Sequence, residues 1–60
     1  MASLDVNVKE NGATVESITI KVDSIVSIKS MDSGNDTEVT LADGRKLLVD
    51  TAFATVKAAL

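Results

Sequence analysis

The stretch DTEVTLADGRKLLVD, residues 36–50, decides the fold predicted for this 60-residue chain. Two runs of strand-forming residues flank Asp43-Gly44, and a two-residue Asp-Gly link is typical of a tight β-hairpin. The type I′ turn of such a hairpin requires positive φ at both central residues, which Asp tolerates and Gly adopts freely. Each arm carries apolar residues on one face, namely Val39 and Leu41, then Leu47 and Val49. We therefore predict an antiparallel hairpin that turns at Asp43-Gly44.

Further strands are expected nearer the N-terminus. Residues 4–9 alternate between apolar and polar side chains, and Asn11-Gly12 is a second two-residue hairpin signal. Residues 13–22 are rich in β-branched side chains, but the face that carries the apolar residues changes within this run. A β-bulge or a strong bend near Glu16-Ser17 would reconcile the two halves of the run.

The next strand is expected over residues 24–30. In this strand Ile25 is predicted to point to the face opposite that of Val26 and Ile28, because successive side chains of a strand alternate. The link that precedes the strand contains no Gly. A single long, bent strand over residues 13–30 is therefore an open alternative to two strands.

The last ten residues change from a period of two to a helical period. Residues 51–60 include four alanines, which favour helix, and an apolar face made by Phe53, Val56 and Leu60. Asp50 or Thr51 is expected to cap the N-terminus of this helix. Because so short a helix is not stable alone in water, it is expected to dock on its own sheet or on a neighbouring molecule.

These elements predict one small domain, residues 1–60, of mainly β or small α+β class. Five antiparallel strands are expected to form either a meander or a small bent-sheet barrel, with one C-terminal helix at about residues 51–60. No internal repeat, linker or low-complexity segment divides the chain.

The chain is short for its apolar content. Hydrophobic residues make up 45% of it, yet it has no Cys for disulfides, no His for zinc and no Pro to stiffen its loops. A chain of this size buries only roughly 60% of its unfolded surface, so we expect it to gain further burial by associating with copies of itself. The residues expected at the interface are the apolar side chains off the main face and those of the helix: Val15, Ile25, Leu48, Phe53, Val56 and Leu60.

Enzymatic and metal chemistry find little support in the residue types present. The chain has no His, Cys or Tyr, so the common general bases and nucleophiles are absent, and we expect no catalytic residue and no cofactor. The segment 32–36, Asp-Ser-Gly-Asn-Asp, is dense in oxygen ligands that suit calcium. It lacks the spacing and the closing Glu of a helix–loop–helix calcium site, and these residue types are also typical of turns. We therefore predict an ordinary turn and no metal site.

The charge pattern bears on the partners and on the location of the protein. The net charge is −3, and the longest basic run is Arg45-Lys46, which is the candidate contact for an anion or a nucleic acid. Phe53 is the only aromatic residue, whereas oligonucleotide-binding proteins combine basic grooves with aromatic stacking platforms. The sequence shows no apolar run long enough to span a membrane and no pattern of a signal peptide, so a cytoplasmic location is expected.

Two resemblances add to this interpretation. Residues 12–60 resemble the short FlbD/SwrD-type flagellar proteins, tiny β-rich chains that end in a helix and are associated with flagellar motor function. The shared pattern consists of Ile25-x-x-Ile28, Asp36-Thr37-x-Val39-Thr40-Leu41-x-x-Gly44-x-Lys46-x-x-Val49 and Val56. The strand expected at the N-terminus of this chain departs from that pattern.

The second resemblance is architectural. A five-strand bent sheet with one helix is similar to Sm-like barrels, which form rings and bind RNA. Those carry the helix at the N-terminus, whereas it is C-terminal here, and Gly44 precedes Arg45 instead of following it. Small chains of this composition are also common in phage genomes, as virion parts or as oligomeric inhibitors of host systems, although this last likeness is an analogy only.

Two functional hypotheses follow. The first is a non-enzymatic, self-assembling structural or interaction module, phage-related by the analogy above, with copies of itself or another protein as partner. The alternative is an Sm-like oligomer that binds nucleic acid or a nucleotide through a patch containing Arg45 and Lys46, repeated around a ring.

Overall fold

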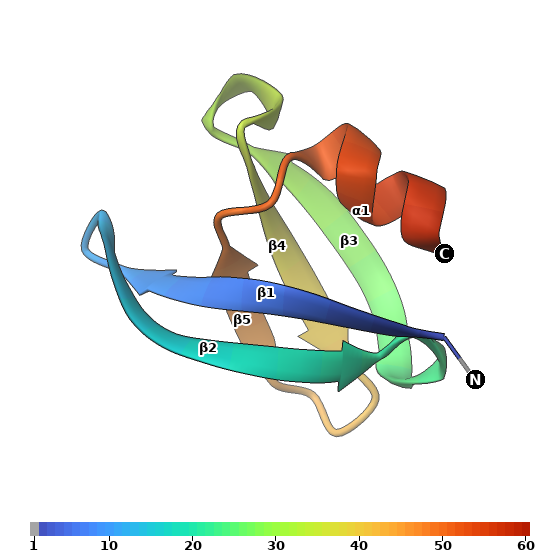
Figure 1. Cartoon of the computed structure of the whole chain (residues 1–60). Coiled ribbons are helices and arrows are strands. Elements are labelled where there is room, and N and C mark those ends of the chain that lie inside the picture. Colours follow the sequence, from blue (N-terminus) through green and yellow to red (C-terminus); the bar gives the residue numbers. More distant parts are fainter. Residues whose placement is uncertain (1) are drawn as a thin grey trace.

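The computed structural model describes residues 2–60. These residues form one five-stranded antiparallel sheet with a C-terminal helix (Figure 1). The predicted mainly β class is confirmed. The strands are β1 (Ser3–Glu10), β2 (Ala13–Lys21), β3 (Ile25–Met31), β4 (Asp36–Leu41) and β5 (Lys46–Val49), and the helix is α1 (Phe53–Ala59). Two short 3₁₀ turns, η1 (Val22–Ser24) and η2 (Asp32–Gly34), connect β2 to β3 and β3 to β4. Because η1 separates β2 from β3, residues 13–30 form two strands and not one.

The strand order is β2-β1-β5-β4-β3, so β1 and β5 are neighbours and the consecutive strands β2 and β3 lie at opposite edges. This order matches the bent-sheet alternative, with the sheet open between β2 and β3. The β1–β2 hairpin crosses in front of the other three strands (Figure 1). The junction between β1 and β5 is short: Val8 pairs with Val49, and the Asp50 N–H donates to the Asn7 carbonyl at 3.0 Å.

The two hairpin turns differ in type. Asn11 and Gly12 have φ of 54° and 81°, and Glu10 pairs with Ala13, so the predicted two-residue hairpin is present and its turn is of type I′. At the other hairpin, Gly44 has φ of 92°, but Asp43 is not among the described non-glycine residues with positive φ.

The second hairpin is therefore present, but the predicted type I′ turn at Asp43-Gly44 is wrong. The Gly44 N–H donates to the Leu41 carbonyl at 2.9 Å, and the Leu41 N–H donates to the Arg45 carbonyl at 2.8 Å. This pattern is a type I turn followed by a glycine bulge. The Asp43 carboxylate stabilises the wider loop by accepting from the Arg45 backbone N–H at 3.0 Å.

Both edge strands contain a bulge. On β2 the bulge is at Val15, because Val8 pairs with Glu16 while Lys9 pairs with Thr14; the predicted position was one residue later. On β3 the register shifts across Val26. Val15 and Val26 are 55% and 67% exposed, so each bulge turns a valine towards solvent.

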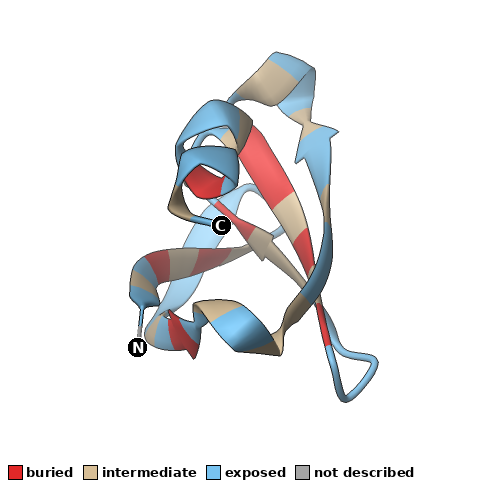
Figure 2. Ribbon diagram, turned by 90° about the vertical axis from the view of Figure 1, so that its right-hand side faces the viewer, coloured by how far each residue is buried: buried red, intermediate tan, exposed pale blue. Residues whose placement is uncertain are grey.

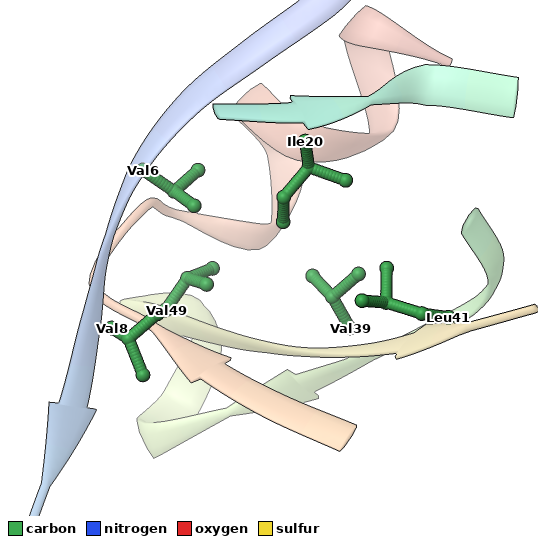
Figure 3. Packing of buried hydrophobic residues seen from close by; sticks show 6 residues of the cluster. All are labelled: Val6, Val8, Ile20, Val39, Leu41 and Val49. Atoms are coloured by element: carbon green, nitrogen blue, oxygen red, sulfur yellow. The ribbon is translucent and has the colours of Figure 1, made fainter. Parts of the chain in front are cut away.

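The core lies between the β1–β2 hairpin and the inward face of β3, β4 and β5. Figure 3 shows side chains from both sides pointing towards one another, namely Val6, Val8, Ile20, Val39, Leu41 and Val49. Val39 and Val49 are fully buried at the centre of the predicted hairpin. Leu47 and four apolar side chains from the first three strands pack around them half-buried: Leu4, Ile18, Ile25 and Ile28.

Helix α1 packs on β3 and β4 through Val56, which is fully buried, while most of its remaining surface is exposed (Figure 2). The predicted cap at Asp50 or Thr51 is wrong: the helix begins after Ala52, and no side chain caps it. Thr51 instead ties the segment before the helix to the sheet, because its carbonyl accepts from the Thr37 hydroxyl at 2.8 Å.

Candidate interaction surface

Within the described residues 2–60, one edge of β2 has no neighbouring strand. The Val22 N–H donates to the Ala2 carbonyl at 3.1 Å, which places this pair among the hydrogen-bonded pairs of the β1–β2 ladder. In an antiparallel ladder such pairs alternate along the strand, so beyond the bulge at Val15 the odd-numbered residues of β2 direct their backbone groups away from β1. The backbone N–H and C=O groups of Ser17, Thr19 and Lys21 form what we call the free edge of β2.

A shallow groove of about 230 Å³ lies beside the second half of β2. Its apolar lining comes from Ile18 and Ile20 of β2 and from Leu41 of β4, and Lys21 and Arg45 also line it. The groove therefore combines unpaired backbone groups with apolar side chains. Such a combination suits an extended strand, whose main chain can continue the sheet while its side chains cover the apolar lining.

The opposite edge of the sheet, on β3, is less regular. At the start of β3 the Ala42 N–H donates to the Ser24 carbonyl at 2.8 Å, and the bulge at Val26 follows. Bulges are one of the means by which proteins prevent edge-to-edge pairing. On β2 the bulge at Val15 leaves residues 16–21 regular, so the longer uninterrupted edge belongs to β2.

The outward face of the β1–β2 hairpin carries a row of polar side chains over a shallow depression of about 480 Å³. The Thr19 hydroxyl donates to Asp5 at 2.6 Å and the Ser17 hydroxyl donates to Asn7 at 2.6 Å. The Asn7 amide donates in turn to the Asp50 carboxylate at 3.3 Å. Because these groups satisfy one another, the row stiffens the hairpin across both strands.

Lys9 and Asp36 form an ion pair of 3.0 Å that the sequence did not reveal. The two side chains are 21% and 11% exposed, and they connect the β1–β2 hairpin to the start of β4. The hydrogen bond to Asp36 raises the pKa of Lys9 above its ordinary value of 10.5. No pattern signals this pair, since Lys9 lies on a strand that alternates as any surface strand does and Asp36 follows 27 residues later.

The candidate calcium segment, residues 32–36, forms η2 and the start of β4. Asp32, Ser33 and Gly34 have φ of 50°, 56° and 94°, values typical of a tight turn. Asp36 is nearly buried and directed to Lys9. Within residues 2–60, no group of three or more His, Cys, Asp or Glu side chains is arranged to hold a metal ion.

The six predicted interface residues separate into two groups. Val15 and Leu60 are more than half exposed, and Leu48 and Phe53 are half-buried, so these four remain accessible. Val56 is fully buried against the sheet, and a partner molecule cannot reach it.

The prediction of Ile25 as an interface residue is also wrong, because its side chain packs half-buried against the core. The bulge at Val26 reverses the alternation of side chains, so Ile25 and Ile28 share the inward face and Val26 points out. The prediction that Ile25 points to the face opposite that of Val26 and Ile28 assumed a regular strand without a bulge.

The candidate anion contacts lie at the β4–β5 turn. Arg45 is exposed, and its Nε donates to the Asp43 carboxylate at 2.8 Å. The pKa of Asp43 is lowered from 3.8, first by the Arg45 backbone N–H and then by the Arg45 side chain. A phosphate group would compete with Asp43 for Arg45, whereas exposed Lys46 has no ion-pair partner in the described part of the chain.

No helix in residues 2–60 combines the length and the apolar character needed to cross a membrane. Comparisons of the chain with protein-family models, with curated proteins and with solved structures found no match.

Proposed function

We propose that this chain is a non-enzymatic interaction module that associates with copies of itself through the free edge of β2. The observation that carries the proposal is the unpaired backbone of Ser17, Thr19 and Lys21 beside an apolar groove. A second copy of β2, in antiparallel orientation, would satisfy these groups and cover the groove.

The composition of the core supports self-association. Five of the seven buried hydrophobic residues are valines, and Phe53, the one aromatic residue of the chain, is only half-buried. Burying a side chain of this class contributes roughly 1.5–3 kcal/mol, with valine at the lower end because burial scales with apolar area. A small core of small side chains leaves a 60-residue domain marginal, so burial shared between copies adds a large fraction of its stability.

A two-fold arrangement gives the association a defined register. For the inward faces of both sheets to remain on the same side, residues of equal parity must face one another across the axis. The register centred on Thr19 places it opposite the same residue of the second copy and places Ile18 opposite Ile20 of the second copy. It brings Thr side chains and apolar side chains together, which are favourable cross-strand pairs.

The test is the molecular mass of the untagged protein in solution, measured by native mass spectrometry and by sedimentation equilibrium at micromolar concentration. We expect a defined oligomer for the natural chain. Replacing Thr19 with Pro removes an N–H of the free edge while sparing the ladder to β1, so we expect a folded monomer. The matched control, Thr19→Val, keeps the N–H but loses the hydroxyl bond to Asp5, and it should remain an oligomer.

Three outcomes would contradict the proposal. The natural chain could be a folded monomer at all concentrations tested, or Thr19→Pro could assemble as the natural chain does. Nucleic acid that co-purifies with the oligomer, and is released by salt and by Lys46→Ala, would favour the Sm-like alternative. If Thr19→Pro does not fold, Ser17→Lys together with Thr19→Lys blocks the edge with charges while keeping every backbone donor.

A further inference from the structure

The tip of the β1–β2 hairpin contains a dipeptide whose side chain and backbone can react with each other. Asn11 and Gly12 are both exposed, and the loop contains only these two residues, because Glu10 and Ala13 already pair. We propose that Asn11-Gly12 is a site of self-modification, at which the Asn11 amide is lost through attack by the Gly12 backbone nitrogen. The proposal does not depend on the function proposed above.

The nucleophile is unhindered and unpaired. A Cβ placed on Gly12 would meet no heavy atom within 4 Å apart from those of its chain neighbours, so no other described segment covers this residue. In a two-residue loop the closing residues make the hairpin hydrogen bonds, and among residues 2–60 no backbone bond outside the regular elements uses the Gly12 N–H. The glycine also lacks a side chain that would oppose the backbone rotation needed for attack.

The chemistry needs only water as a co-reactant. The Gly12 nitrogen attacks the side-chain carbonyl carbon of Asn11, gives up its proton to solvent and forms a new C–N bond. The bond from that carbon to the amide nitrogen breaks, and ammonia leaves. The resulting five-membered succinimide is opened by water at either of its carbonyls. Opening at one carbonyl gives Asp, and opening at the other gives isoaspartate, whose main chain runs through the former side chain; no oxidation or reduction takes place.

The other asparagines lack this combination. Asn7 lies within β1, where its side chain donates to Asp50 and accepts from Ser17, and the next residue is Val8. Asn35 is followed by Asp36, which is nearly buried and paired with Lys9.

Asp43-Gly44 is the closest comparison, since it is also an acid- or amide-type residue before Gly in a turn. There the nucleophile is engaged, because the Gly44 N–H donates to the Leu41 carbonyl at 2.9 Å. The electrophile is engaged as well, because the Asp43 carboxylate accepts from the backbone and the side chain of Arg45. Modification is therefore expected to be confined to Asn11.

The product changes the hairpin tip in two ways. It adds one negative charge to a protein whose net charge is already −3. When isoaspartate forms, it also adds a main-chain atom to a two-residue loop, which strains the closing pair of Glu10 and Ala13. The fraction of molecules modified at the hairpin tip would thus increase with the age of the protein, while the core remains unchanged.

The experiment incubates the folded full-length chain in mildly alkaline buffer over several weeks. Intact-mass spectrometry should show a gain of about one dalton, the difference between an amide and an acid. Fragmentation by electron transfer should place the change at position 11, with isoaspartate in excess over Asp. The control Asn11→Gly keeps a residue suited to positive φ and should show no gain in mass.

Each alternative result would overturn the inference. These are an unchanged mass, a gain that appears equally at Asn7 or Asn35, and a gain at the same rate in Asn11→Gly. A gain that appears in concentrated urea but not in the folded chain would also overturn it, because it would mean that the folded turn protects Asn11.

Discussion

Replacing Val49 with Ala removes two buried carbon atoms at the place where β1 meets β5. Val49 is fully buried, and it pairs with Val8 in the short junction that holds the β1–β2 hairpin to the rest of the sheet. At about 0.8 kcal/mol per buried CH₂ group, the lost transfer free energy is about 1.6 kcal/mol. The cavity left behind raises the expected loss in the free energy of unfolding to about 2–3 kcal/mol.

This loss is large for a domain of this size. At roughly 0.05–0.15 kcal/mol per residue, a chain of 60 residues is stable by about 3–9 kcal/mol. The midpoint of thermal unfolding should fall by about 10–20 °C, since each kcal/mol shifts it by about 4–8 °C in small domains.

The assay is urea unfolding followed by far-ultraviolet circular dichroism, because the chain has no Trp or Tyr. Protein concentration must be the same for all variants, since self-association would contribute to the apparent stability. The matched control is Leu48→Ala, which removes more carbon atoms from the adjacent but only half-buried residue and should cost about 1 kcal/mol. A loss for Val49→Ala below 1 kcal/mol, or below that of Leu48→Ala, would refute the assignment of this junction to the core.

Two further predictions concern polar side chains that connect separate elements of the fold. Thr37→Val removes the hydroxyl that donates to the Thr51 carbonyl and leaves that carbonyl without this partner; the expected loss is about 1–2 kcal/mol, and an unchanged urea midpoint would refute it. Lys9→Met should lower the thermal midpoint at neutral pH, because Asp36 loses its partner. The pKa of Lys9 is raised in the folded chain, so its contribution is complete below the ordinary value of 10.5 and is lost as pH rises through the folded pKa. The difference between the natural chain and Lys9→Met should therefore shrink in strongly alkaline buffer, and a constant difference across that range would contradict the role of the ion pair.

Short sequence motifs predicted those features of the fold that depend on interactions between neighbouring residues. The two-residue hairpin predicted at Asn11-Gly12 is present, because this dipeptide itself favours positive φ at both residues. Asp43-Gly44 has the same form, but Arg45 donates to Asp43 and the loop widens by a glycine bulge. The interaction that decides between the two turns comes from a residue outside the dipeptide, and dipeptide propensity does not include it.

Features that depend on contacts between distant parts of the chain were predicted less well. A bulge at Val26 reverses the two faces of β3, and this turned Ile25 from a predicted interface residue into part of the core. Val56 was correctly placed on the apolar face of the helix, but it docks on its own sheet and is closed to a partner, whereas Phe53 and Leu60 of the same face remain accessible. The free edge of β2 could not be found from the sequence, because it depends on the pairing of β1 with β5.

The most direct test of self-association through β2 is amide hydrogen exchange, measured by nuclear magnetic resonance at low and at high protein concentration. The N–H groups of Ile18 and Ile20 donate to β1 and should be protected at both concentrations. Self-association through the free edge predicts that Ser17, Thr19 and Lys21 exchange fast in dilute solution and slowly in concentrated solution. Fast exchange of these three amides at every concentration, or slow exchange already in the monomer, would contradict it.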